Sequence, residues 1–296
     1  MIKYPENFNK SGYTLINYNY EKSEILLNID HIYIIHLCNN GRLGNINEQL
    51  EKIKPRSISV LFNEGFKSGK KDKEIDVSYK DLVDANLFVM RDAKKKGYNN
   101  ILIFEDDFVI SEDFMDKDNL ESINNFINHN DYDVFYLGCV IRKIKEKINE
   151  NILLIDTCWT THAIIFSKKI IDYYTTLSFQ NICYINDWDN FLVENMKKKY
   201  TFIQPLIIQP FPPTENRLTS WGNLDFRIKR WIKKPNKKSD QIVRKMVAEI
   251  IRKKLPLERV SKINNLIKLF DTTNNPRLLF DIVTKMALLR YDLFKN

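Results

Sequence analysis

Three consecutive acidic residues, Glu105, Asp106 and Asp107, follow directly after the apolar run Ile101–Phe104. Like charges this close raise one another's pKa and disfavour burial. A hard cation such as Mg²⁺ or Mn²⁺ compensates them, because it prefers oxygen ligands and bridges carboxylates to substrate phosphates. On an extended backbone, residues 105 and 107 point the same way while 106 points aside. The spacing therefore predicts a metal held by Asp107 and Glu105, with Asp107 the more direct ligand; a solvated turn before a helix is the alternative.

The segments around the acidic triplet predict an α/β fold. Short apolar runs, typical of buried strands, alternate with helical patterns. The expected strands are 31–37, 57–62, 101–104, 133–141, 161–167 and 201–209, and the expected helices are 78–96, 111–128, 168–176 and 188–199. This order favours a doubly wound, mostly parallel sheet with helices on both faces. Ligands in such sheets bind beyond the carboxyl ends of the strands, which is where the triplet falls.

Two further positions have side chains that suit proton transfer or phosphate binding. Asp187 and Asp189 flank Trp188 near the start of an expected helix. One acid can cap that helix, and one can serve as the general base that deprotonates an acceptor hydroxyl. His162 begins an apolar strand, where it is either a buried core histidine or a group that donates to a phosphate or binds metal.

Cofactor contacts are expected from the ends of the first two predicted strands. Arg42 follows the first strand, and its guanidinium matches the geometry of diphosphate oxygens. Asn63 ends the second strand and could approach a base or ribose, and Asp106 lies between the two metal-binding acids. A solvated loop position is the alternative for Arg42.

The charge is unevenly distributed along the chain. Residues 225–296 hold 19 Lys and Arg against 7 Asp and Glu, whereas residues 1–224 hold 27 against 31. We therefore expect two parts: a body at 1–224 and a basic tail of amphipathic helices at 225–296. A solvated surface is the simplest interpretation of the tail, and peripheral contact with an anionic membrane is the functional one. Nucleic acid is disfavoured, because no aromatic RNA-binding strand or Cys/His zinc motif accompanies the charge.

Cysteine usage and the N-terminus bear on the compartment. The four cysteines, Cys38, Cys139, Cys158 and Cys183, are widely spaced in or beside apolar runs, which predicts free buried thiols. The first residues lack the apolar region of a signal peptide, and no apolar run reaches the ~18 residues of a membrane span. These features predict a cytoplasmic protein, with a peripheral membrane contact as a further hypothesis.

Five segments, in order over roughly residues 31–210, resemble glycosyltransferase family 25, which includes bacterial lipooligosaccharide galactosyltransferases, collagen galactosyltransferases and members from large DNA viruses. GYNNILIFEDDFVI resembles its G-Y-x-x-(I/V)-L-I-x-E-D-D segment, and IYIIHLCNNGRLGNI its first strand, with Arg42 at or near the family Arg. DYDVFYLGCV, TTHAIIFSKK and DWDNFL are similar to its later segments, the last placing Asp189 at the family aspartate. His36 stands where the family usually has Asn, and the basic tail has no counterpart.

The resemblance implies a GT-A-type, metal-dependent, inverting glycosyltransferase with a UDP-hexose donor, galactose or glucose. The acceptor would be a hydroxyl of a glycan, lipid or protein. Two other classes stay open on the residues alone: a noncatalytic GT-A-like protein that docks through its tail, and a nucleotidyltransferase, since paired acids on a doubly wound sheet also serve that chemistry.

Overall fold

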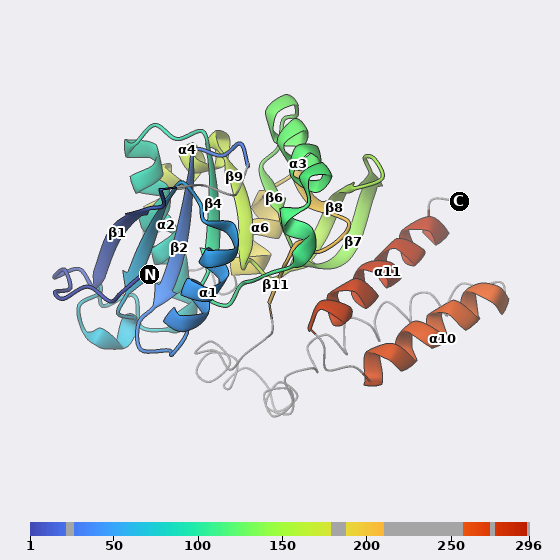
Figure 1. Ribbon diagram of the computed structural model, residues 1–296, viewed down its shortest axis with the longest axis horizontal. Coiled ribbons are helices and arrows are strands. Elements are labelled where there is room, and N and C mark those ends of the chain that lie inside the picture. The colour runs from blue at the N-terminus through green and yellow to red at the C-terminus, as the bar shows by residue number, and fades with distance from the viewer. Residues whose placement is uncertain (22–26, 179–187, 210–256, 273–275, 295–296) are drawn as a thin grey trace.

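A nine-stranded sheet forms the centre of the computed structural model, which describes residues 1–21, 27–178, 188–209, 257–272 and 276–294 (Figure 1). The strand order is β1-β3-β2-β4-β9-β6-β10-β8-β7. These strands are β1 (Tyr13–Asn19), β2 (His31–Leu37), β3 (Ser57–Asn63), β4 (Asn100–Glu105), β6 (Val134–Tyr136), β7 (Val140–Lys147), β8 (Ile152–Trp159), β9 (Ala163–Ser167) and β10 (Lys199–Phe202). A separate two-stranded sheet pairs β5 (Val109–Ile110) with β11 (Ile207–Ile208).

Seven α-helices are described, most of them in the connections between strands. They are α1 (Leu43–Ile53), α2 (Ser78–Lys95), α3 (Lys117–His129), α4 (Lys168–Thr176), α6 (Trp188–Asn195), α10 (Leu257–Thr272) and α11 (Pro276–Phe294). Two short 3₁₀ turns, Phe66–Ser68 and Glu112–Met115, precede α2 and α3. The α/β class expected from the sequence is confirmed.

The sheet is mixed rather than mostly parallel. Strand β2 runs parallel to both β3 and β4, and β10 runs parallel to β6. The other five neighbouring pairs of this sheet in the described residues are antiparallel. Strands β7 and β8 show the reason, because the four residues between them are too few for the crossover of a dozen or more that parallel pairing requires. The parallel arrangement therefore holds where the site residues gather, at β3, β2 and β4.

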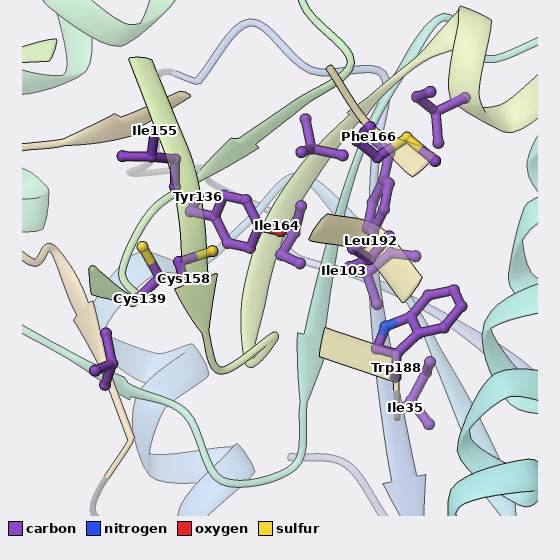
Figure 2. Packing of buried hydrophobic residues seen from close by; sticks show 14 of the residues in the cluster. Ile35, Ile103, Tyr136, Cys139, Ile155, Cys158, Ile164, Phe166, Trp188 and Leu192 are labelled. Carbon is purple, nitrogen blue, oxygen red and sulfur yellow. The ribbon is translucent and has the colours of Figure 1, made fainter. Parts of the chain in front are cut away.

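Side chains of the central strands point alternately to the two faces of the sheet, and this divides the core into two layers. Ile32 and Ile34 of β2 pack with α1 and α3 on one face of the sheet. Tyr33 and Ile35 pack with α2, α4 and α6 on the other, as part of the cluster shown in Figure 2. Successive side chains of a strand point to opposite faces, so one continuous apolar run serves both layers. This places helices on both faces, as expected.

Most predicted segments appear with small shifts. The ranges 31–37, 57–62, 101–104 and 168–176 are confirmed, whereas 133–141 and 201–209 each overlap two separate strands, β6 and β7 in the first and β10 and β11 in the second. The helix expected at 111–128 starts later, at Lys117, because Asp116 caps it by accepting from the backbone N–H groups of Asp118 and Asn119. Strands β1 and β8 were not predicted.

The described part of the tail packs on the body. Helix α11 buries Phe280, Val283 and Met286 within the same apolar cluster as Tyr136 and Cys139, and its Tyr291 hydroxyl accepts from the backbone N–H of Lys147 at 3.3 Å. The amphipathic helices expected in the tail are represented by α10 and α11, while residues 225–256 lie outside the described residues. None of the described helices combines the length and the apolar character needed to cross a membrane. The membrane contact of the tail stays a prediction.

Candidate functional site

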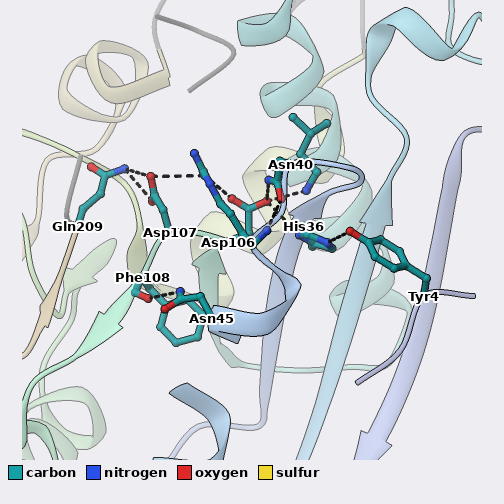
Figure 3. A network of polar contacts seen from close by, with 10 residues as sticks. Tyr4, His36, Asn40, Asn45, Asp106, Asp107, Phe108 and Gln209 are labelled. Atoms are coloured by element: carbon teal, nitrogen blue, oxygen red, sulfur yellow. Dashed lines mark hydrogen bonds and ion pairs between the residues drawn. The ribbon is translucent and has the colours of Figure 1, made fainter. Parts of the chain in front are cut away.

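Asp106 is buried and accepts from four groups at the end of β2 and in the turn after it (Figure 3). Its Oδ2 accepts from the backbone N–H of Leu37 at 2.8 Å and from the Asn40 amide, and lies 3.1 Å from Nδ1 of His36. Its Oδ1 accepts from the Arg42 guanidinium at 2.6 Å. A carboxylate has about four acceptor positions, two on each oxygen, and three of these contacts are on Oδ2 and one is on Oδ1. The expected cofactor contact of Asp106 stays a prediction.

The charge state of Asp106 follows from this setting. Burial acts to raise its pKa, but the hydrogen bond from His36 and the charge of Arg42 outweigh burial and hold the pKa below its ordinary value. An ionised Asp106 only accepts, so His36 Nδ1 is the donor, and His36 Nε2 lies 3.1 Å from the Tyr4 hydroxyl oxygen. The loop after β2 is therefore tied to β4 through a buried, ionised carboxylate.

Asp107 lies between Arg42 and Gln209. The Gln209 amide nitrogen lies 2.8 and 2.9 Å from Oδ1 and Oδ2 of Asp107, and the Arg42 guanidinium lies 3.6 Å from Oδ2. Burial acts to lower the pKa of Arg42, but Asp106 and Asp107 outweigh burial and raise it. Arg42 thus offsets the charge of two acids at once. Its contact with a donor diphosphate stays a prediction.

Glu105 ends β4 on the side of β9. Its Oε1 accepts from the Thr161 hydroxyl, and its backbone N–H donates to the His162 carbonyl at 3.0 Å. The residue before Thr161 is Thr160, whose φ of 77° lies in the left-handed region. That conformation is rare for a β-branched residue and costs on the order of 1–3 kcal/mol. The strain is stored next to the residue that binds Glu105.

His162 is completely buried, in the position of a core histidine. Its Nε2 lies 3.0 Å from the Ile207 carbonyl oxygen, and a carbonyl only accepts, so this nitrogen carries the hydrogen. Phe280 of α11 lies edge-on to the ring, with 5.9 Å between the ring centroids. Nε2 therefore has no lone pair to give to a metal in this arrangement, and the phosphate or metal contact of His162 stays a prediction.

Asn63 belongs to a buried polar cluster that the sequence did not reveal. Its amide donates to Asp81 at 2.9 Å, and its side-chain oxygen accepts from the backbone N–H of Gly65 at 2.9 Å. Asp81 also pairs with Lys71 at 2.9 Å. Asp81 lies in the first turn of α2 and is buried. Both ends of the Asn63 amide are thus engaged, and its contact with a base or ribose stays a prediction.

The roles of the two candidate general bases, Asp187 and Asp189, stay predictions. Asp187 lies outside the described residues, and Asp189 is located only as the second residue of α6. Trp188 between them is buried against Tyr174 and Phe191, at centroid distances of 5.2 and 5.7 Å. Trp188 is therefore part of the apolar core between α4 and α6. The buried thiols Cys38, Cys139 and Cys158 are free, as expected, and Cys183 lies outside the described residues.

Glu105 and Asp107, at the end of β4, are the candidate ligands of a divalent ion. Within the described residues, no group of three or more His, Cys, Asp or Glu side chains could hold a metal. Mg²⁺ is commonly bound by one or two carboxylates, with waters and substrate phosphates completing its shell. Glu105 ends β4, and Asp107 lies in the turn that follows it, not on the extended backbone that the sequence predicted. As carboxylate oxygen donors, the two residues suit an ion of that kind when the phosphates come with the substrate.

Comparison with known proteins gives no family. No family model and no curated protein matches the chain. Among solved structures, it is similar to the crystal structure of A197 from STIV, with 12% identity and a TM-score of 0.34, over 58% of this chain and 80% of that chain. A TM-score this low carries no argument about fold or activity.

Proposed function

We propose that the chain is a metal-dependent inverting glycosyltransferase of the GT-A type, similar to glycosyltransferase family 25. It would move a hexose from a UDP-hexose to the hydroxyl of a glycan, lipid or protein. The observation that carries the proposal is the position of Glu105, Asp106 and Asp107. They lie at the carboxyl end of β4, beside the parallel strand β2, and ligands of α/β sheets bind at such ends.

Glu105, Asp106 and Asp107 would have different roles. Asp107 and Glu105 would hold Mn²⁺ or Mg²⁺, which when bound offsets the charge that builds on the leaving diphosphate. Asp106 acts through Arg42, because their 2.6 Å ion pair holds the guanidinium beside Asp107. Asp189 or Asp187 would take the proton from the acceptor hydroxyl as the sugar carbon is attacked.

A panel of nucleotide sugars, assayed for release of free nucleotide with and without Mn²⁺, tests the proposal. We expect metal-dependent release of UDP from one UDP-hexose, and loss of that release in Asp107→Asn. Asp172→Asn is the matched control, because Asp172 is an exposed acid that pairs with Lys94 and Lys168 on the protein surface.

The same assay separates the rival classes. Release of pyrophosphate from a nucleoside triphosphate would identify a nucleotidyltransferase instead. Absence of release for every donor, with metal present and the protein folded, would leave the noncatalytic GT-A-like protein as the better account.

A further inference from the structure

We propose that Gln209 is the positioning residue that orients the Asp107 carboxylate for a divalent ion. This inference rests on the proposed function, because it concerns the same metal ligand. The amide nitrogen of Gln209 lies 2.8 Å from one carboxylate oxygen of Asp107 and 2.9 Å from the other. A donor shared by both oxygens restricts rotation of the carboxylate, and hydrogen bonds to ligating carboxylates orient them and tune affinity.

Strand β11 places Gln209 next to Asp107. Its two residues pair with β5 in the register Ile207↔Ile110 and Ile208↔Val109. Strand β5 begins two residues after Asp107, and Gln209 directly follows β11, so the pairing brings two segments 102 residues apart into contact. Two residue pairs are a short ladder, and β11 needs other anchors to hold Gln209 in place.

Those anchors come from the ends of β6 and β9. The backbone N–H groups of Leu206 and Ile207 both donate to the Leu137 carbonyl, at 2.9 and 3.1 Å. In the next peptide group, the Ile207 carbonyl accepts from His162 Nε2 at 3.0 Å. The Phe280 ring of α11 makes a T-shaped contact with the His162 ring. The buried histidine therefore acts as a support for β11.

Gly138 supplies the space that this arrangement requires. A Cβ at Gly138 would lie 1.7 Å from the Ile207 carbonyl oxygen and 2.9 Å from its carbonyl carbon. No side chain fits there, so a glycine after β6 is a condition for β11 to lie where it does. Gly138, His162 and β11 thus form one support whose far end is the Gln209 amide on Asp107.

Titration of the protein with Mn²⁺ alone, followed by electron paramagnetic resonance of the free ion, tests this role without an activity assay. Gln209→Met keeps the length of the side chain and removes its donors. We expect its Kd for Mn²⁺ to rise about 10- to 100-fold, the range typical of lost outer-shell contacts to a metal ligand. Gln209→Ala gives a second measurement if the methionine variant folds poorly.

Gln204→Met is the matched control. Gln204 lies five residues earlier, and its amide donates to a different carboxylate, Asp113, at 2.6 Å. The Gln204→Met variant should bind Mn²⁺ with the same Kd as the unmodified protein. An equal loss in both glutamine variants would overturn the inference, because the effect would then be a general loss of structure.

Asp107→Asn distinguishes failure of the inference from failure of the proposed function. If Asp107→Asn abolishes Mn²⁺ binding while Gln209→Met leaves it unchanged, Gln209 has no positioning role and the metal site stands. If the unmodified protein binds no Mn²⁺, with or without UDP, the proposed function and the inference both fail.

Discussion

Lys71 and Asp81 form an ion pair of 2.9 Å in which the two side chains are only 2% and 5% exposed. The Lys71 ammonium also lies 3.0 Å from the centre of the Tyr13 ring. Burial lowers the pKa of Lys71 against the opposing effect of Asp81. Removing one member of such a pair leaves a buried charge without compensation, so the pair makes the end of β3 sensitive to substitution.

Lys71→Met should therefore lower the free energy of unfolding by about 3–5 kcal/mol. Urea denaturation at pH 7 measures this change. The double variant Lys71→Met with Asp81→Leu should be more stable than Lys71→Met alone, because it removes the unpaired charge. A single variant as stable as the unmodified chain would show that the pair is not isolated from solvent.

Asp106 predicts how stability depends on acidity. Its pKa in the folded protein is held below the ordinary value, and the unfolded value is about 3.9. The carboxylate therefore contributes stability that is present above pH ~4 and is lost as the pH falls through the folded pKa. Urea denaturation between pH 7 and pH 3 should show Asp106→Asn less stable by about 3–5 kcal/mol at pH 7 and less affected by acid. Parallel pH curves for the two proteins would contradict this account.

Gly138→Ala should destabilise the protein by about 1–3 kcal/mol or more, because the added carbon meets a backbone oxygen that cannot move aside alone. Gly44→Ala is the control: Gly44 lies in α1 with no atom within 4 Å of an added Cβ, and the exchange should be neutral or stabilising by up to about 1 kcal/mol. Thermal unfolding of the two variants side by side provides the comparison. Equal stability would show that β11 can shift away without loss.

Phe280→Ala should cost about 3–5 kcal/mol, the usual range for a buried aromatic residue. Phe280 is 1% exposed and lies in one apolar cluster with residues of β6 and β9. Leu269→Ala on α10 should change stability little, because Leu269 is 47% exposed. Denaturation followed by fluorescence measures both. A negligible effect of Phe280→Ala would mean that α11 does not unfold together with the body.

Local pattern was sufficient to predict the strands that carry the site. His31–Leu37 and Asn100–Glu105 are short, apolar and rich in β-branched residues, so both strands and the acidic triplet at the end of the second are evident from the sequence. The strand order and directions of the whole sheet were harder to predict. Strand β8 follows the charged strand β7 after a four-residue turn, and this hairpin gives antiparallel neighbours that the alternation of strands and helices did not predict.

The partners of the acids could not be predicted, because they depend on contacts between distant segments. Asp106 binds the end of β2 and the turn after it, 64 to 70 residues earlier. Asp107 binds Gln209, which the sequence placed in an uninterrupted strand. Nothing in the local spacing of Gln209 distinguishes it from other glutamines. The surroundings of His162 could not be predicted for the same reason, because its contact with Phe280 depends on how α11 folds back onto the body.

The two-residue pairing of β11 with β5 has a consequence for how this chain tolerates changes in length. Because side chains alternate along a strand, a shift of one position turns each of them to the opposite face. One residue added to or removed from the short connection between β10 and β11 would aim a neighbour of Gln209 at the acid and turn the amide away. The connection at 203–206 is therefore a place where the length of the chain, more than its composition, decides whether the carboxylate at 107 is held.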